Sequence, residues 1–423
     1  MTLAALPPFG GTVNVDAKGW YPPGAEVTVE ATPAEGFVFD GWTAPAGEFV
    51  DANDATTTFT MPAQDVTVEA LFNLFEFSCP FVYSYDGSKY HFEHEAIPFS
   101  VFRALENTSY GNLRMLNAVD GKYHISIREE LDEISFVNGF MVSAVDYPEN
   151  TSVKEVMVDI YGNPHTIKER ITPDKFNDSK GNSKLEEVTQ KGVLVSSNLS
   201  LMDGEYVEAY EATFNIPEYA GEDAKLMISA QKTEIVNQVA TQLIEKIDGK
   251  NNLWWVERVL DTPTYKNITT DFVSIFKMWV EIWDGKEWVK QGEIEAGMHL
   301  LEEFLVPLNL NIIEDKTNNI KVRLRSGAGF YELDQVSIDF YKNVNMDKQE
   351  LVPQEAVFND EDDVKSVIGD FDNDKRIRMY QGDKIDLVYE KPLLGEGYQR
   401  GVNAKIKCTK NAKVKCATKK SQY

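Results

Sequence analysis

The sequence predicts a mainly β, multidomain protein: a small all-β repeat domain, then a larger antiparallel β-sandwich or jelly-roll-like region with one inserted helix. Three observations predict this class. Many short runs alternate apolar and polar residues, which is the period of a half-buried strand. Clusters of Gly, Pro, Asn and Asp separate these runs and supply the backbone angles of turns. One stretch, residues 233–247, has apolar residues at the three- and four-residue spacing of an amphipathic helix.

Length and charge limit the function classes. A chain of 423 residues predicts two to three domains. Its formal net charge of −26 argues against a nucleic-acid partner, because phosphate recognition needs a basic surface. The acidic balance is compatible with an extracellular acidic surface, with or without bound calcium, and also with solubility alone, which is the simpler interpretation.

The first predicted domain covers residues 8–73. Residues 12–15, 27–31 and 66–70 alternate apolar and polar side chains, and each is bounded by a turn cluster. Prolines lie at the strand ends, where no ladder hydrogen bond is lost. The bulky residues left for the core of so small a domain are aromatic: Phe37, Phe39 and Trp42.

The same stretch carries a family resemblance. Three segments follow one another along the chain: Gly11-Thr12-Val13-Asn14-Val15, Gly36-Phe37-Val38-Phe39-Asp40-Gly41-Trp42 and Val66-Thr67-Val68-Glu69-Ala70-Leu71-Phe72. In this order they resemble the divergent InlB B-repeat. That family consists of small all-β modules of bacterial surface and secreted proteins. The resemblance implies an extracellular or cell-envelope location. Because residues 1–6 have no charged start and are too short for the apolar core of a signal peptide, we expect the signal peptide to be absent from this chain.

The second predicted domain is a β-rich region over residues 79–220. Residues 79–85 and 89–94 flank Asp86-Gly87, a hairpin turn signal. This opening is similar to that of a largely uncharacterised module of bacterial envelope and secreted proteins, and the similarity continues through residues 113–133. The resemblance adds a context and no activity.

The third region, residues 221–345, combines the helix of residues 233–247, which Gly249 ends, with a sandwich. Residues 278–283 and 287–290 form a hairpin around Asp284-Gly285. The strands of residues 320–325 and 333–340 are similar to the closing pair of galactose-binding-like jelly rolls. Many β-sandwiches end in the same way.

The C-terminal part changes character twice. Residues 346–400 form an acidic segment followed by a hairpin of residues 376–380 with 385–389. Residues 401–423 are Lys-rich, contain no acidic residue and show no periodicity, so we expect a basic disordered tail. A segment foreign to the natural protein is the rival interpretation of this tail.

Metal ligands are sparse. Asp370, Asp372 and Asp374 have the spacing of the first three ligands of a calcium loop, but Lys375 and Gln381 replace its Gly and its bidentate Glu. We therefore expect no cofactor, with calcium at these three aspartates as the alternative. His91 and His94 lie three residues apart on a predicted strand, which directs them to opposite faces and prevents a shared ion.

Tryptophans supply the candidate ligand-binding residues, which are Trp279, Trp283 and Trp288. Trp279 and Trp283 share one strand face because they are an even number apart. Burial in the sandwich core is the favoured interpretation of these rings, because Trp is highly buried on average. Glu281 has the same parity, and burying an unpaired carboxylate is costly, which argues in the opposite direction and nearly cancels the preference for burial.

Nucleophile-elbow, phosphate-loop, dinucleotide and zinc-protease motifs are all absent from the sequence. No apolar run reaches the ~20 residues of a transmembrane helix. We therefore expect a non-enzymatic bacterial cell-surface or secreted protein for adhesion, envelope assembly or partner binding, with a protein or glycan at the cell surface as the partner. A carbohydrate-binding protein with an exposed aromatic face is the alternative. An enzyme with a site assembled from scattered carboxylates is a third hypothesis, which a cleft with convergent carboxylates would favour.

Overall fold

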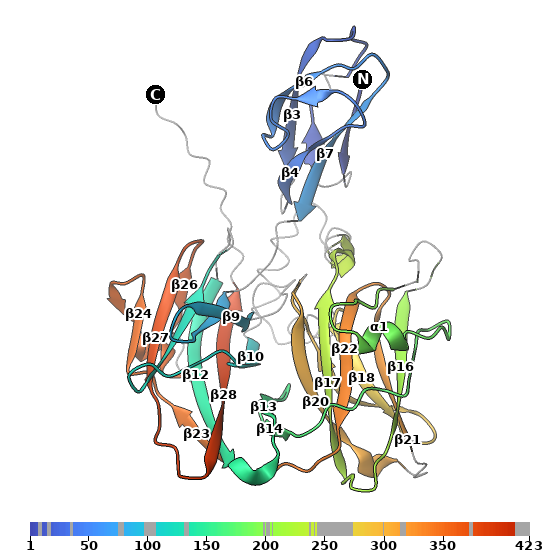
Figure 1. Cartoon of the computed structure of the whole chain (residues 1–423). Coiled ribbons are helices and arrows are strands. Elements are labelled where there is room, and N and C mark those ends of the chain that lie inside the picture. Colours follow the sequence, from blue (N-terminus) through green and yellow to red (C-terminus); the bar gives the residue numbers. More distant parts are fainter. Residues whose placement is uncertain are drawn as a thin grey trace, which may run out of the picture. The chain divides into compact units, whose positions relative to one another are not determined.

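The computed structural model describes residues 1–6, 11–14, 18–33, 37–74, 80–96, 107–130, 135–197, 199, 204, 206–236, 238–240, 242, 274–298, 300–313, 319–371 and 375–410. These residues are mainly β-strands in antiparallel sheets, which confirms the predicted fold class (Figure 1). The chain divides into two compact units, residues 1–77 and 78–423.

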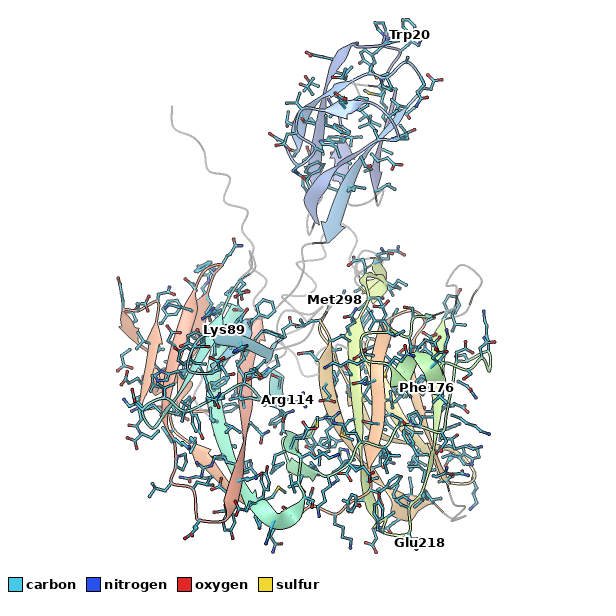
Figure 2. The ribbon with its side chains drawn as sticks, in the orientation of Figure 1. Trp20, Lys89, Arg114, Phe176, Glu218 and Met298 are labelled. Atoms are coloured by element: carbon cyan, nitrogen blue, oxygen red, sulfur yellow. The ribbon has the colours of Figure 1, made fainter. Side chains whose placement is uncertain are left out.

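The N-terminal unit contains two small sheets. Their orders are β1-β7-β4 and β2-β3-β6-β5, built from β1 (Thr2–Leu6), β2 (Gly11–Val13), β3 (Glu26–Pro33), β4 (Phe37–Thr43), β5 (Glu48–Phe49), β6 (Thr56–Thr60) and β7 (Thr67–Leu74). Trp42 is buried, as predicted, and its Nε1 donates a hydrogen bond to the carbonyl oxygen of Asp54 at 3.1 Å. Trp20 projects from the end of this unit (Figure 2).

The predicted start of this unit at residue 8 is wrong. Strand β1 pairs in parallel with β7, and Leu3 on β1 is buried in the core with Val68 of β7. Residues 1–6, which precede the predicted domain, are too few to show the apolar–polar alternation from which a strand is predicted. Their pairing depends on a partner more than sixty positions away.

The second unit contains two β-sandwiches. In the first, the sheet β10-β28-β12-β23, with β26 beside β12, packs on the sheet β25-β24-β27-β11-β8-β9. The strands are β8 (Phe81–Tyr85), β9 (Tyr90–Glu95), β10 (Asn107–Asn112), β11 (Lys122–Arg128), β12 (Ser135–Pro148), β23 (Asp347–Leu351), β24 (Glu355–Phe358), β25 (Asp362–Asp363), β26 (Ile377–Met379), β27 (Lys384–Glu390) and β28 (Tyr398–Lys410). The short helix α5 (Lys365–Ile368) buries Ile368 in its core.

The second sandwich packs the sheet β15-β16-β21-β18-β19 on the sheet β20-β17-β22. Its strands are β15 (Lys175–Asn177), β16 (Val207–Asn215), β17 (Asp223–Lys232), β18 (Met278–Trp283), β19 (Trp288–Ile294), β20 (Glu302–Asn309), β21 (Asn319–Gly327) and β22 (Tyr331–Asp339). The hairpin β13 (Glu155–Val158) with β14 (Pro164–Ile167) lies between the two sandwiches (Figure 1). Helix α1 (Leu185–Thr189) contacts β15 and β22.

The predicted helix is present where it is described. Residues 234–236, 238–240 and 242 are helical, and Val236 and Ala240 are buried in the core of the second sandwich. Its apolar face therefore packs into the core of this sandwich. The predicted end at Gly249 lies outside the described residues.

The predicted disordered tail is wrong for residues 401–410. Strand β28 pairs antiparallel with β12 from Tyr398 to Lys410 and with β10 along its outer side. Ile406 of β28 is buried in the core of the first sandwich. The Lys-rich composition concealed this strand, in which the buried residues Ala404, Ile406 and Cys408 alternate with the half-buried residues Lys405 and Lys407. Residues 411–423 lie outside the described residues.

Sheet pairing also cuts across the predicted subdivision at residues 220/221 and 345/346. Strands β16 and β17 lie on either side of the first boundary, and both belong to the second sandwich. Strands β23 to β28 follow the second boundary, yet they complete the sandwich that begins at β8. The residues from 78 onward form one compact unit in which the chain leaves the first sandwich and returns to it.

Candidate functional site

Strand β18 directs its tryptophans away from the sandwich core. Val280 and Ile282 are 0% exposed and belong to the core of the second sandwich. Trp279 and Trp283 alternate with them and are half-buried. The structure therefore confirms that the two tryptophans share one face of their strand, and it corrects the expected burial in the core, because Val280 and Ile282 fill the core instead.

Neighbouring strands add cations to this outward face. We define the tryptophan–arginine face by seven residues: Trp279, Glu281 and Trp283 of β18, Trp288 and Lys290 of β19, and Arg323 and Arg325 of β21. In the ladder, Glu281 is paired with Lys290 on one side and Arg323 on the other. Regular strand pairing thus fixes where each of these residues stands.

Glu281 is buried at the centre of the face, and arginines compensate its charge. Its Oε2 accepts a hydrogen bond from Arg323 Nε at 2.7 Å and lies 3.5 Å from Arg325 Nε. Burying a carboxylate is tolerated when it is paired and hydrogen-bonded. This ion pairing explains how Glu281 can be buried on the same strand face as Trp279 and Trp283.

The three tryptophans have different surroundings. The Arg325 guanidinium and the Lys290 ammonium lie 4.3 and 4.2 Å from the ring centroid of Trp279, so cations cover this ring. Trp283 and Trp288 contact each other edge to face, with centroids 5.5 Å apart. The structure therefore brings Trp283 and Trp288 together, with the Arg323 guanidinium 4.5 Å from the ring centroid of Trp288, and places Trp279 in a separate cation–π cluster.

The hairpin turn holds the Trp283–Trp288 pair at the end of the sheet. Asp284 Oδ1 accepts hydrogen bonds from the backbone N–H groups of Lys286 and Glu287 at 2.6 and 2.8 Å. These bonds lower the pKa of Asp284, with the bond from Glu287 as the largest cause. A rigid turn with an aromatic pair beside it can present an apolar contact to a ligand.

The calcium hypothesis stays a prediction. Asp370 is exposed, whereas Asp372 and Asp374 lie outside the described residues. Over the part of the chain that the structure describes, no three His, Cys, Asp or Glu side chains gather as a metal site requires. His91 pairs with Asp86 at 2.6 Å, while His94 is buried, so the two histidines have separate surroundings as predicted.

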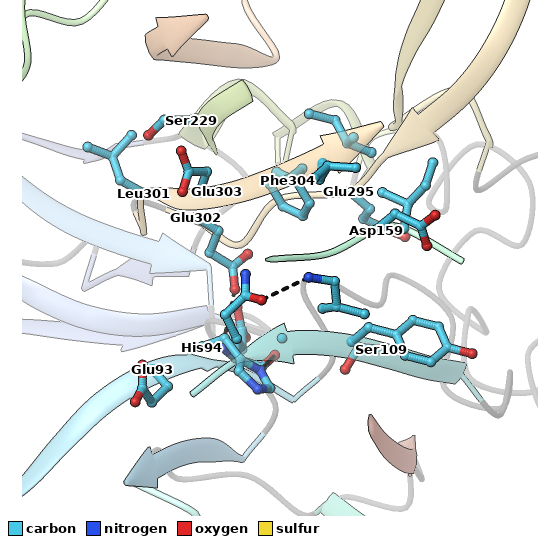
Figure 3. Close-up of a pocket in the computed structure, with 18 of the residues that line it drawn as sticks. Glu93, His94, Ser109, Asp159, Ser229, Glu295, Leu301, Glu302, Glu303 and Phe304 are labelled. Carbon is cyan, nitrogen blue, oxygen red and sulfur yellow. Dashed lines mark hydrogen bonds between the residues drawn. The ribbon is translucent and has the colours of Figure 1, made fainter. Parts of the chain in front are cut away.

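Sequence reasoning missed a cavity of about 420 Å³ in the second unit. Its walls come from β9, β10, the β13–β14 hairpin and the second sandwich (Figure 3). We call it the acidic cavity because it is lined by eight carboxylates, Glu93, Glu95, Asp159, Glu293, Glu295, Glu302, Glu303 and Asp334, and by the cations Arg114, Lys191 and Lys277. A cavity with convergent carboxylates is the feature that favours the third hypothesis, an enzyme, which stays a prediction. The wide separation of these residues in sequence gave no local signal.

An ion network joins the two sandwiches beside this cavity. Glu303 of β20 contacts both Arg114 and Arg170, and both arginines also contact Glu155 of β13, at 3.2 and 2.6 Å. Burial acts to raise the pKa of Glu303, but hydrogen bonds and charge from the two arginines outweigh it and lower the pKa. The network therefore keeps Glu303 ionised.

Comparison with known proteins identifies the first unit. Residues 1–75 match the divergent InlB B-repeat domain. The B-repeat resemblance is thereby confirmed, and it indicates a protein of the bacterial surface type. No curated protein matches the chain. Within the described residues, no helix has both the length and the apolar character needed to cross a membrane.

Solved structures share only a distant likeness with the chain. A protein of the infectious bursal disease virus T13 particle is 7% identical, with 88% of this chain and 78% of that chain covered and a TM-score of 0.17. A Sulfolobus turreted icosahedral virus protein is 10% identical, with 79% of this chain and 91% of that chain covered and a TM-score of 0.15. The GH31 alpha-xylosidase of Xanthomonas citri is 7% identical, with 92% of this chain and 30% of that chain covered and a TM-score of 0.15. At such TM-scores these likenesses carry no argument about fold or function.

Proposed function

We propose that this protein is a non-enzymatic, extracellular or cell-envelope protein of bacteria that binds a partner at a cell surface through the tryptophan–arginine face. The observation that carries the proposal is the outward orientation of Trp279 and Trp283 over a core-facing Val280 and Ile282. Tryptophan and arginine are the residue types enriched at the energetic centres of protein interfaces. The match to a bacterial surface repeat supports the location.

The face is preorganised for binding. Paired strands fix its backbone, and the Glu281–Arg323 ion pair and the cation–π contacts hold its side chains. A partner therefore meets side chains that have already lost much of their rotational freedom, which lowers the entropic cost of association. This arrangement supports adhesion or partner binding as the role of the face.

A glycan is the second candidate partner, and the Trp283–Trp288 pair favours it. These two half-buried rings stand beside the exposed turn at Gly285 and Lys286. Aromatic rings in such positions stack on the apolar faces of sugars. Trp279 contributes less to this alternative, because Arg325 and Lys290 already cover its ring.

Cell binding tests the proposal. The fluorescently labelled chain is incubated with bacterial and animal cells, and binding is measured by flow cytometry for the wild type and for the double variant Trp283→Ala/Trp288→Ala. We expect the double variant to lose at least tenfold in affinity. The matched control is Trp20→Ala, which removes an 84% exposed tryptophan of the other unit and should leave binding unchanged.

The nature of the partner follows from treatment of the cells. Trypsin removes surface proteins, whereas periodate oxidises glycans, so the treatment that abolishes binding identifies the partner class. Equal binding by the wild type and the double variant would overturn the role of this face, as would absence of binding to every cell type.

A further inference from the structure

Most carboxylates of the acidic cavity have a described partner. Glu303 contacts Arg114 and Arg170. Glu293 accepts from Lys277 at 2.8 Å and from Lys290 at 2.6 Å. Asp159 lies 2.9 Å from His165 Nε2 and accepts backbone N–H bonds as well. The charges of these three carboxylates are compensated by partners within the protein, so none of them requires a ligand as counter-ion.

Glu302 differs from these groups. Its Oε1 accepts from the backbone N–H of Glu95 at 3.2 Å and its Oε2 from the backbone N–H of Gly297 at 2.9 Å. The nearby Lys232 has its ammonium 3.2 Å from Glu295. Burial raises the pKa of Glu302 to about 7, against the lowering effect of the two N–H bonds and of Lys232. A proton therefore occupies this carboxylate for part of the time near neutral pH.

His94 is a second, independent observation in the same cavity. The side chain lines the cavity on the side of β9 and is 8% exposed (Figure 3). Its Nδ1 lies 3.1 Å from the carbonyl oxygen of Glu95, and since a carbonyl only accepts, Nδ1 carries the proton. Nε2 is then an acceptor, and it is buried without a hydrogen-bond partner. Burial also lowers the pKa of His94, which keeps the ring neutral.

The backbone around these groups leaves them room. A Cβ atom at Gly111 would stand 2.3 Å from His94 Nε2, and one at Gly297 would stand 2.5 Å from Glu95 Oε2 and 3.5 Å from Glu302 Oε2. Both positions therefore need glycine as long as the side chains stay where they are. The cavity volume of about 420 Å³ falls in the range of small-molecule sites.

We propose that the acidic cavity binds a small organic cation through a primary ammonium group that pairs with Glu302, with His94 Nε2 as a further acceptor. Eight carboxylates line the cavity, against three lining cations and the three further cations Arg170, Lys232 and Lys290 that pair with them, so an excess of negative charge remains that attracts cations. The unpaired acceptor His94 Nε2 needs an N–H or O–H donor, and a donor with positive charge also stabilises the ionised form of Glu302. The ammonium takes the place of that proton. This site is separate from the tryptophan–arginine face and does not depend on the function proposed for it.

Isothermal titration calorimetry on the full chain tests the inference. The probe is putrescine, and 1,4-butanediol is the matched ligand with the same chain length and no charge. We expect putrescine to bind and butanediol not to bind. Titration at pH 7 in two buffers of different ionisation enthalpy should show proton release, because the cation displaces the proton of Glu302. A third probe, the methylamide of Nα-acetyl-lysine, distinguishes a free amine from a lysine side chain as the source of the ammonium.

Variants assign the binding to the cavity. Glu302→Gln keeps the shape of the side chain, and we expect at least a tenfold loss of putrescine affinity together with loss of proton release. Glu361→Gln, at an exposed position outside the cavity, is the control and should change neither. Absence of putrescine binding, equal binding of butanediol, or an unchanged affinity of Glu302→Gln would each overturn the inference.

The wild type alone provides a further test in case Glu302→Gln does not fold. The charged and titratable groups around Glu302 are Glu95 of β9, Lys232 of β17, Glu295 after β19 and the neutral His94. Since the cation competes with a proton, putrescine affinity should rise about tenfold between pH 6 and pH 8. An affinity independent of pH over this range would contradict pairing with Glu302.

Discussion

Glu281 Oε2 of β18 accepts a hydrogen bond of 2.7 Å from Arg323 Nε of the neighbouring strand β21, on the sheet face that also carries Trp279 and Trp283. This ion pair allows a carboxylate to be buried in the middle of a candidate binding surface. It also fixes the arginine that lies 4.5 Å from the ring centroid of Trp288. The stability of the pair and the order of the face are therefore linked.

Replacement of Arg323 by Met should lower the free energy of unfolding by about 2 kcal/mol, because it leaves Glu281 buried with only the more distant Arg325. Urea-induced unfolding followed by tryptophan fluorescence measures the effect. The control is Lys321→Met, at an exposed position on the same face of β21, which should change stability by less than about 0.5 kcal/mol. The double variant Glu281→Leu/Arg323→Met should recover most of the loss. A double variant less stable than Arg323→Met would contradict this account.

The C-terminal strand should be essential for the first sandwich. Ile406→Ala removes a side chain that is 0% exposed on β28, and we expect a loss of about 3 kcal/mol from lost burial and the resulting cavity. Leu393→Ala makes a similar truncation at a residue that is 99% exposed and should cost less than about 0.5 kcal/mol. Thermal unfolding compares the two variants. Equal melting temperatures would show that β28 is dispensable.

The N-terminal unit should fold alone only when β1 is included. A fragment of residues 1–77 should give a dispersed amide NMR spectrum, because its core is contained within this unit. A fragment of residues 8–77 loses the parallel partner of β7 and the buried Leu3, so we expect its melting temperature to fall by at least 10 °C. Two fragments of equal stability would indicate that β1 contributes nothing to the core.

Glu302 should make stability depend on pH in a defined direction. Its pKa is raised in the folded state to about 7, so the native protein binds more protons than the unfolded chain between pH 4.5 and 7. The stabilisation from this group is complete below pH 4.5 and is lost as the pH rises through 7. The free energy of unfolding of the wild type should therefore fall relative to Glu302→Gln between pH 5 and pH 8, by about 1–3 kcal/mol.

Urea unfolding of the two proteins at half-unit pH intervals measures this difference. Glu361→Gln, at an exposed position, is the control and should follow the pH dependence of the wild type. A constant difference between the wild type and Glu302→Gln across this range would show that Glu302 has an ordinary pKa.

Local patterns predicted several features of the binding surface. Alternation placed Val280 and Ile282 on one face of a strand and the tryptophans on the other, because side-chain direction in a strand has a period of two. Asp284-Gly285 predicted the hairpin, since this pair supplies the conformation that a tight turn requires. The partners that cover Trp279 were beyond this reasoning. Arg325 comes from a strand more than forty positions away, and its position depends on which strands pair.

The sequence by itself determined the mainly β class, the position of the helix within the second sandwich and the B-repeat character of the first unit, because these depend on spacing over a few residues or on one contiguous stretch. Tertiary structure alone decided that β28 completes the first sandwich with β12, and that β1 belongs to the N-terminal unit. It also assembled the acidic cavity from residues between Glu93 and Gln335. The physical reason is that strand pairing satisfies backbone hydrogen bonds between distant segments. Strand composition limits which segments can pair, while the packing of the whole core selects the pairs that form.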